Sequence, residues 1–341
     1  MKKIYKSLLL QMPLVMAAAL ATVSCERLIF EEEGDCDPHY FVEFVYDMNM
    51  EFADAFPSQV NSVSLFVFDE EGRLAGSWQD AGDALAQKGY RIPLDGLAPG
   101  RYEFIAWCGL ADNAGHFTLA SSVARPEDLR CTMSRAYADG AAWSDANLSP
   151  LFHGLETAEL PDTEGEHVVT VYLTKDTNNI NLSLTQMGGE GMQEGQYTVR
   201  MSDANGLMAH DNSLLADEPI EFRPWYTVYG TEELGAPVSR ASDDAVLNYM
   251  RTEISTGRLM SDRDPRIDII DNGTGETVFS IPIVQWVKAF RSENHAGMGD
   301  QEYLDRQDEY DVMIYLSGQN WIGARIEING WRIRDNGRAD L

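Results

Sequence analysis

Apolar and polar residues alternate over many short stretches of this chain, and the clearest stretch runs from Val60 to Phe68. Val63, Leu65 and Val67 would share one face of a strand there, because side chains at alternate positions point the same way. A glycine-containing turn follows, and Arg73 to Trp78 is predicted as the antiparallel partner of a hairpin. This alternation indicates a half-buried sheet.

Similar stretches recur along the chain, separated by Gly, Pro, Asn and Asp residues that favour turns. Helical spacing is found at Val284–Arg291, and Met48–Pro57 is a short helix or an irregular crossing. Many short strands predict a mainly β protein with two tandem β-sandwich domains and minor helical insertions. The other predicted strands are Tyr40–Tyr46, Tyr90–Leu94, Tyr102–Trp107, His167–Thr174, Ile180–Leu184, Tyr197–Met201, Ile220–Phe222, Trp225–Tyr229, Val246–Ile254 (helix remains an alternative), Arg266–Ile270, Thr277–Ile283, Tyr310–Leu316 and Trp321–Ile333.

The domain boundary is predicted at the polar segment Lys175–Asn179, which suits a linker. Residues 39–175 then form the N-terminal β-sandwich and residues 176–341 the C-terminal one, each of ordinary domain size. Residues 25–38 are rich in Asp and Glu and are predicted to be a solvated tether ahead of the fold.

The first 24 residues have the layout of a secretory signal, with three lysines followed by an apolar stretch from Leu8 to Ala21. Because the stretch leads through small residues to Cys25, it resembles a lipoprotein signal peptide, in which that thiol is lipidated and the chain is cut just before it. Thr22 departs from the pattern, which favours Leu there. The alternative is an ordinary signal cut near Ala21 that leaves Cys25 free.

Acidic residues dominate the chain, with 55 Asp and Glu against 26 Lys and Arg and a formal net charge of -29. Removal of residues 1–24 takes away three lysines and no acid, so the mature chain would carry -32. This balance argues against nucleic acid as a partner and against adsorption to anionic lipid, because both need clustered basic residues.

The other cysteines, Cys36, Cys108 and Cys131, are odd in number, so at most one disulfide forms among them within the chain. Export permits such a bond. The sequence leaves open which two would pair, and three unpaired thiols are an equal alternative.

Catalytic and metal-binding motifs are missing from the sequence. The six histidines are isolated, and no zinc-binding, nucleophile-elbow or phosphate-loop motif is present. The carboxylates around Asp264 and Asp268 lack calcium-loop spacing, because Pro265 to Ile267 interrupt it. The sequence therefore predicts no cofactor, no metal and no enzymatic activity.

Several segments resemble the FimB-like family of fimbrial anchor subunits of Bacteroidales. The resemblance covers nearly the whole mature chain and rests on the order and spacing of its segments. The most specific segment is Gln301–Tyr310 (Q-E-Y-L-D-R-Q-D-E-Y). The others are Phe44–Met50, Ala53–Phe56, Leu65–Gly72, Pro99–Tyr102, Ala106–Leu110, Leu173–Lys175, Asn178–Ile180, Trp321 and Ile326–Trp331.

The resemblance implies two transthyretin-like β-sandwiches in a surface-exposed lipoprotein, attached to the outer membrane through Cys25. It implies that the protein holds the base of a fimbrium, binds the shaft subunit and influences fibre length. It also implies assembly by β-strand addition, in which main-chain hydrogen bonds supply affinity and side-chain pockets supply specificity.

Shaft subunits that resemble this family lose their first strand to a trypsin-like protease. This chain has no Lys or Arg between Arg27 and Arg73, so such a protease would leave the Tyr40–Tyr46 strand in place. Only a short polar tail, 335–340, follows the last predicted strand, so strand donation would use Trp321–Ile333 itself.

A second function is consistent with the same features. A cell-surface adhesin or glycan-binding lipoprotein, at a fibre tip or free-standing, would share the signal peptide, the acidity and the sandwiches. An exposed aromatic patch or a metal site would favour it. Within Gln301–Tyr310, Tyr303, Leu304 and Tyr310 are predicted to be core. Asp305, Arg306 and Glu309 are predicted to form a local charge network.

Overall fold

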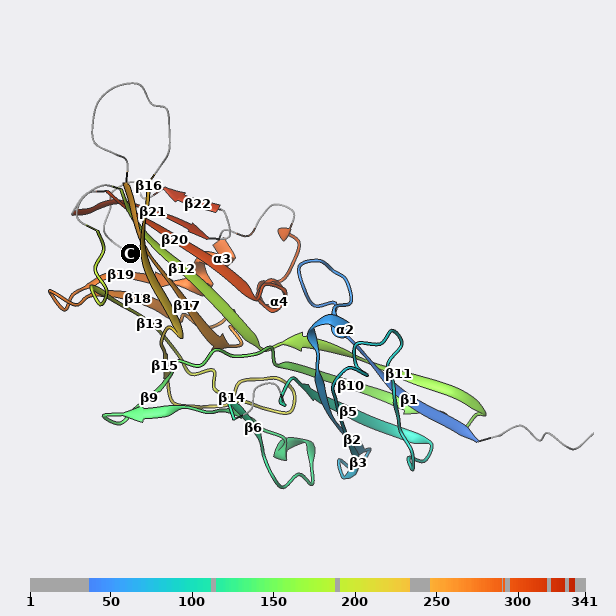
Figure 1. The fold of residues 1–341 in the computed structure, drawn as a ribbon. Coiled ribbons are helices and arrows are strands. Elements are labelled where there is room, and N and C mark those ends of the chain that lie inside the picture. Colours follow the sequence, from blue (N-terminus) through green and yellow to red (C-terminus); the bar gives the residue numbers. More distant parts are fainter. Residues whose placement is uncertain are drawn as a thin grey trace, which may run out of the picture.

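The computed structural model describes residues 37–111, 115–187, 191–233, 246–289, 291, 295–317, 320–328 and 331–334. In the described part the molecule is elongated, and β1 begins at the end farthest from the C-terminal half (Figure 1). The fold is mainly β, as predicted, with several sheets and few helical turns.

The N-terminal half is a seven-stranded sheet in the order β3-β2-β5-β10-β11-β1-β4. The first strand pairs in parallel with β11 along its whole length, from Pro38–Gly165 to Val45–Tyr172. The strands are β1 (Pro38–Val45), β2 (Ser62–Asp69), β3 (Leu74–Ala81), β4 (Ile92–Pro93), β5 (Gly100–Cys108), β10 (Phe152–Leu160) and β11 (Gly165–Lys175), and one helical turn, α2 (Phe56–Gln59), precedes β2.

The C-terminal half contains two six-stranded sheets. One has the order β16-β17-β12-β20-β21-β22 and the other β19-β18-β13-β15-β9-β8. Their strands are β12 (Thr177–Met187), β16 (Tyr226–Glu233), β17 (Val246–Gly257), β20 (Glu309–Ser317), β21 (Asn320–Ile328) and β22 (Trp331–Arg334), then β8 (Ala136–Ala138), β9 (Ala141–Ser144), β13 (Tyr197–Asp203), β15 (Ile220–Phe222), β18 (Arg266–Asp271) and β19 (Thr277–Pro282).

Smaller elements complete the fold. A three-stranded sheet has the order β14-β7-β6, and two short helices follow β19. The helix predicted at Val284–Arg291 is confirmed as α3. The elements are β6 (Phe117–Leu119), β7 (Cys131–Met133), β14 (Leu207–Met208), the 3-10 helix η1 (Pro126–Asp128), α3 (Ile283–Ala289) and α4 (Asp300–Arg306).

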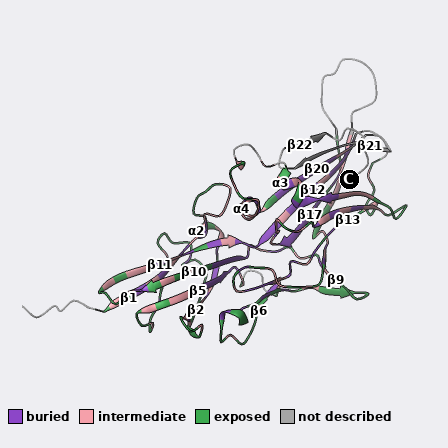
Figure 2. Ribbon diagram, turned by 180° about the vertical axis from the view of Figure 1, so that it is seen from behind, coloured by how far each residue is buried: buried purple, intermediate pink, exposed green. Residues whose placement is uncertain are grey.

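Two buried hydrophobic clusters form the core (Figure 2). Val63, Leu65 and Val67 lie in the cluster of the N-terminal half, which confirms the face that alternation predicted. Phe68 and Trp107, on the opposite face of the same sheet, belong instead to the cluster that fills the C-terminal half. A continuous apolar core therefore joins the two halves.

The segment Lys175–Asn179, predicted as a linker, forms the junction between two strands. Only Asp176 separates β11 from β12, and its side chain is fully buried, as are those of Thr177 and Asn178. The predicted ranges 39–175 and 176–341 also do not divide the sheets cleanly. Strand β9 from the first range pairs in parallel with β15 from the second, Ile220 opposite Ala142.

Two predicted elements differ in detail. Trp321–Ile333 was predicted as one strand and consists of two, β21 and β22, whose antiparallel pairing places Ile328 opposite Trp331. Val246–Ile254, where helix was an alternative, lies in strand β17 and pairs with β12 along its length. Residues 48–55 are largely irregular, and the helical turn begins only at Phe56.

Candidate assembly interfaces

The first strand is firmly held in the N-terminal half. Besides its eight parallel pairings with β11, it pairs with β4 through Phe41 and Val42. Val42 and Phe44 point into the core and are at most 4% exposed, and the Tyr40 hydroxyl donates to the Pro161 carbonyl at 2.7 Å. Removal of this strand would expose an apolar groove between β11 and β4.

The junction between the halves is closed by a buried polar network. Arg258 donates from Nε and Nη2 to the two carboxylate oxygens of Asp305 at 2.8 and 2.7 Å, and from Nη1 to the Asn212 carbonyl at 2.8 Å. The Asn212 amide in turn donates to Asp176 Oδ1 at 2.9 Å. These contacts join the residue after β17, helix α4, the loop after β14 and the β11–β12 junction.

Asp176 is the most deeply placed member of this network. Burial raises the pKa of its carboxyl to about 7, although Arg258, 3.9 Å away, and the Asn212 amide act in the opposite direction. Its Oδ2 has no hydrogen-bond partner among the described residues. A desolvated carboxylate with one unpartnered oxygen favours the neutral form.

Helix α4 also contacts the N-terminal half directly. Arg306 Nη1 donates to the carbonyls of Asp47 and Asn49, at 2.8 and 3.2 Å, in the irregular segment after β1. Its guanidinium lies 4.4 Å from the centre of the Phe52 ring. Nearby, Lys175 pairs with Asp308. Helix α4 and the residues after it therefore hold the segment that follows β1 against the C-terminal half.

The family segment Gln301–Tyr310 is thus a structural clamp. Tyr303, Leu304 and Tyr310 are buried, which confirms the prediction that they are core. Instead of pairing with one another as predicted, Asp305, Arg306 and Glu309 have other partners, and the Glu309 carboxylate accepts from the Asn179 amide at 2.8 Å. Arg306 pairs with Glu302 one turn away, whereas the Asp305 partner, Arg258, is distant in sequence.

The structure describes two of the four predicted site cysteines. Cys25 and Cys36 lie outside the described residues. Cys108 and Cys131 are both buried and both free, so the two are not bonded to each other. Burial raises the pKa of each thiol well above its usual range.

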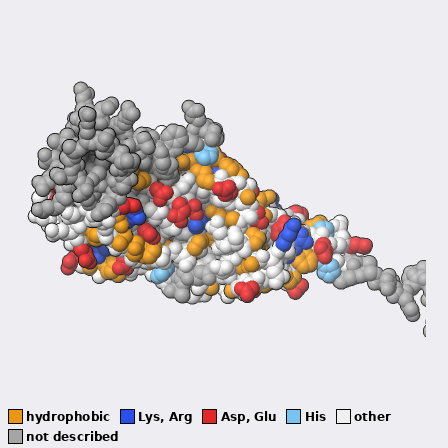
Figure 3. Space-filling model, turned by 45° about the horizontal axis from the view of Figure 1, so that its top comes forward, with side chains coloured by type: hydrophobic (Ala, Val, Ile, Leu, Met, Phe, Trp, Pro, Cys, Tyr) orange, Lys and Arg blue, Asp and Glu red, His pale blue; other side chains and the backbone are white. Residues whose placement is uncertain are grey.

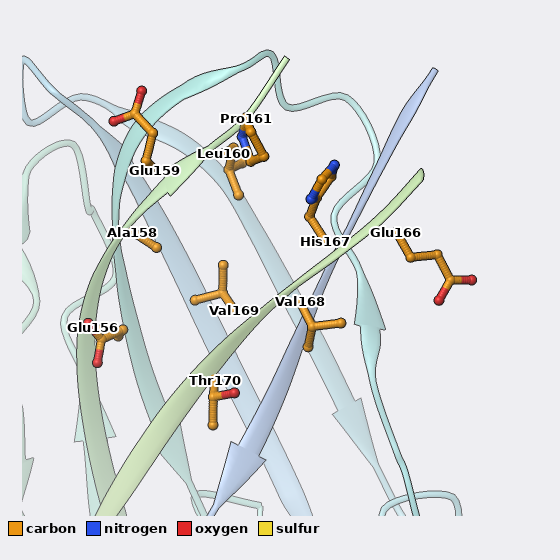
Figure 4. A pocket seen from close by; sticks show the side chains of 10 residues that line it. All are labelled: Glu156, Ala158, Glu159, Leu160, Pro161, Glu166, His167, Val168, Val169 and Thr170. Carbon is orange, nitrogen blue, oxygen red and sulfur yellow. The ribbon is translucent and has the colours of Figure 1, made fainter. Parts of the chain in front are cut away.

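A cleft lies between β10 and β11. Only four residues connect these two strands, and strands with so short a connection usually pair along their whole length. They pair at three positions, from Phe152–Lys175 to Gly154–Leu173, and then separate as β10 follows β5 and β11 follows β1. The cleft, here called the β10–β11 cleft, has a volume of about 510 Å³ (Figure 4). Sequence reasoning missed it because β10 itself was not predicted.

An exposed aromatic pair lies at the start of β16. Trp225 and Tyr226 are 37% and 45% exposed, and their ring centres are 5.8 Å apart. In the other six-stranded sheet, the Arg223 guanidinium lies 4.5 Å from the centre of the Trp143 ring on β9. Such a surface can stack against the apolar face of a sugar or against another protein.

Two further findings concern the described residues as a whole. They contain no group of three or more His, Cys, Asp or Glu side chains arranged to hold a metal ion. No helix within them is long and apolar enough to cross a membrane. On the face seen in Figure 3, Lys and Arg are few and scattered among carboxylates.

In this mainly β architecture the first strand is in place and the two halves are joined by buried polar contacts. Residues 32–337 match the family of fimbrillin-A associated anchor proteins Mfa1 and Mfa2, and the chain belongs to this family. The resemblance to fimbrial anchor subunits is therefore confirmed. Membership makes the chain a fimbrial subunit of the cell envelope, in a structural rather than an enzymatic family.

Individual relatives agree with this assignment. The minor fimbrium anchoring subunit Mfa2 of Porphyromonas gingivalis is 20% identical over 96% of this chain and 95% of its own length. Its solved structure has the same fold, with a TM-score of 0.61 at 17% identity, over 88% of this chain and 99% of the other.

Two Bacteroides thetaiotaomicron structures are more similar in sequence. A proposed adhesin is 31% identical with a TM-score of 0.74, covering 89% of this chain and all of the other. A proposed polysaccharide-binding protein is 29% identical with a TM-score of 0.73, covering 88% and 99%.

Proposed function

We propose that this protein is a lipid-anchored subunit that holds the base of a fimbrium at the outer membrane and influences the length of the fibre. The observation that carries the proposal is the family membership combined with an intact β1. A subunit whose first strand stays in place cannot accept a donor strand in that position, which suits the terminal member of a fibre.

The N-terminal end of the fold suits attachment through Cys25. β1 starts at the end of the molecule remote from the C-terminal half (Figure 1). A lipid on Cys25 would therefore leave the C-terminal half directed away from the membrane. The acidic residues 25–38 would act as a spacer between the lipid and the fold.

Assembly with the shaft subunit proceeds by β-strand addition from the C-terminal half. Strand β22 is the edge of its sheet, where it pairs only with β21 among the described strands. An edge strand presents unpaired main-chain groups to a neighbouring subunit. The two halves correspond to two transthyretin-like sandwiches in this proposal.

The test compares Cys25→Ala with the native chain by metabolic lipid labelling, membrane fractionation and electron microscopy of fimbriae. Cys36→Ala serves as the matched control. The expected result is that only Cys25→Ala loses the label, leaves the outer membrane and yields detached or lengthened fibres. Attached fibres of normal length on the Cys25→Ala strain would refute the anchor role.

The exposed aromatic pair supports a second candidate, a glycan-binding adhesin, as does the similarity to a proposed polysaccharide-binding protein. A glycan array compares the native chain with Trp225→Ala, and with Tyr172→Ala as an exposed aromatic control in the other half. Binding that only Trp225→Ala abolishes would support this candidate. If no glycan on the array binds, the adhesin candidate is refuted and the anchor role is the only one of the two that stands.

A further inference from the structure

The β10–β11 cleft combines two free sheet edges that face each other. β10 pairs with β5 along its whole length, and β11 pairs with β1 along 165–172. On their other sides, Leu155–Leu160 and Gly165–Tyr172 have no strand partner among the described residues. Both edges therefore present main-chain donors and acceptors to the cleft.

The cleft has an apolar floor. Leu160 and Val169 are 1% and 8% exposed and belong to the N-terminal core, and the partly buried Ala158 packs against that core. Figure 4 shows these side chains between the two strands. Such a floor suits the apolar side chains of an extended segment, every second one of which would point inward.

The rim of the cleft is acidic. Three glutamates and no Lys or Arg line it, namely Glu156, Glu159 and Glu166. The side chain of Glu159 makes no hydrogen bond or ion pair within the described part of the chain, and the side chain of Glu166 has a single ion-pair partner there, Arg91 at 3.9 Å. In Figure 4, Glu159 and Glu166 point outward on opposite sides of the cleft.

The size of the opening limits its occupant. The three β10–β11 pairs close one end, and residues 161–164 connect the strands at the other. The unpaired part of β10 has six residues and spans roughly 20 Å. The cleft thus admits a short extended segment rather than a folded domain.

We propose that the β10–β11 cleft binds an extended segment of a partner polypeptide in which apolar residues alternate with Lys or Arg. The segment adds as a strand to β10, to β11 or to both, its apolar side chains cover Ala158 and Val168, which are only partly buried, and its basic side chains meet the rim glutamates. This site lies on the opposite side of β11 from β1, so it is independent of whether the first strand is retained. A second copy of this chain fits less well, because a symmetric contact would bring like carboxylates together.

The test measures binding of a fluorescent heptapeptide of alternating valine and lysine to the full chain in detergent. The matched control peptides replace lysine by glutamate, or carry a central proline that removes a main-chain donor. The expected result is saturable binding of the basic peptide, weakened by salt, with little binding of either control.

Variants and hydrogen exchange locate the site. The double variant Glu159→Gln and Glu166→Gln is expected to bind roughly five- to tenfold more weakly, whereas Glu70→Gln, an exposed glutamate in the β2–β3 turn, binds normally. Ala158→Trp, which fills the cleft, abolishes binding. Peptide binding slows amide exchange at 155–160 and 165–172.

Several outcomes would overturn the proposal. They are equal binding of the acidic peptide, normal binding by the double variant, or protection at β4 or β22 instead of the cleft. Self-association of the chain that the double variant abolishes would assign the cleft to a second copy. Because none of these readouts depends on lipidation or fibres, the proposal can fail while the anchor role stands.

Discussion

Arg258 binds Asp305 through two parallel hydrogen bonds of 2.8 and 2.7 Å, in a site where the two side chains are only 13% and 10% exposed. Paired geometry of this kind offsets the cost of desolvating both charges, but it leaves an unpaired buried charge when one partner is lost. The pair joins the end of β17 to α4. It thereby holds α4, the helix that contacts the N-terminal half, in place.

Asp305→Ala is expected to destabilise the protein by roughly 3 kcal/mol, because Arg258 would remain buried without its carboxylate. Chemical denaturation monitored by circular dichroism measures this change. Glu302→Ala is the matched control, since its carboxylate is 43% exposed and its pair with Arg306 should contribute less than about 1 kcal/mol. Equal effects of the two variants would contradict the clamp.

Asp176→Asn tests the pH dependence of the junction. Because the pKa of Asp176 is raised to about 7 in the folded state, the folded protein holds this proton more tightly than the unfolded chain does. Its contribution to the free energy of unfolding is therefore full below about pH 4 and is lost as pH rises towards 7. The amide mimics the protonated acid and keeps the acceptor for Asn212.

The variant should therefore match the native chain near pH 4 and exceed it in stability at pH 8, by at most about 4 kcal/mol. Denaturant titrations across this range measure the difference. Asp211→Asn is the control of opposite sign, because hydrogen bonds from Ser213 lower the pKa of Asp211. A pH-independent difference for Asp176→Asn would show that the carboxyl does not titrate there.

Glu51→Arg tests how firmly the first strand is held. Trypsin should leave β1 in the native chain, since residues 28–72 contain no Lys or Arg, whereas the variant offers a cleavage site in the exposed segment after β1. The cut strand is expected to stay bound through its pairing with β11 and the burial of Val42 and Phe44. Native and denaturing mass spectrometry detect the bound and the released fragment. Spontaneous loss of the fragment would mean that β1 is readily exchangeable.

Thiol labelling tests the burial of Cys108 and Cys131. Both thiols are enclosed by apolar side chains, and burial raises the pKa of each, so the reactive thiolate is scarce and inaccessible. Iodoacetamide should leave both unmodified in the folded chain and modify both in guanidinium, as peptide mass mapping would reveal. Rapid labelling of either thiol under native conditions would contradict the packing.

The sequence by itself determined the class of fold, the positions of most long strands and the family. Alternation is a local property, so Val63, Leu65 and Val67 could be assigned to one buried face without knowing what covers them. The clamp segment was likewise recognisable as core, because Tyr303, Leu304 and Tyr310 are large and apolar in a charged surrounding.

Only the tertiary structure decided which strands meet. β10 was missed because Gly154, Glu156 and Ala158, at alternate positions of the strand, break the apolar alternation. Glu156 and Ala158 line the cleft. Two contacts join residues far apart in the chain, namely the pairing of β1 with β11 and the ion pair of Arg258 with Asp305. The burial of Asp176 likewise depends on distant segments. Such contacts depend on how completed sheets pack against each other. A local pattern of side chains does not predict that packing.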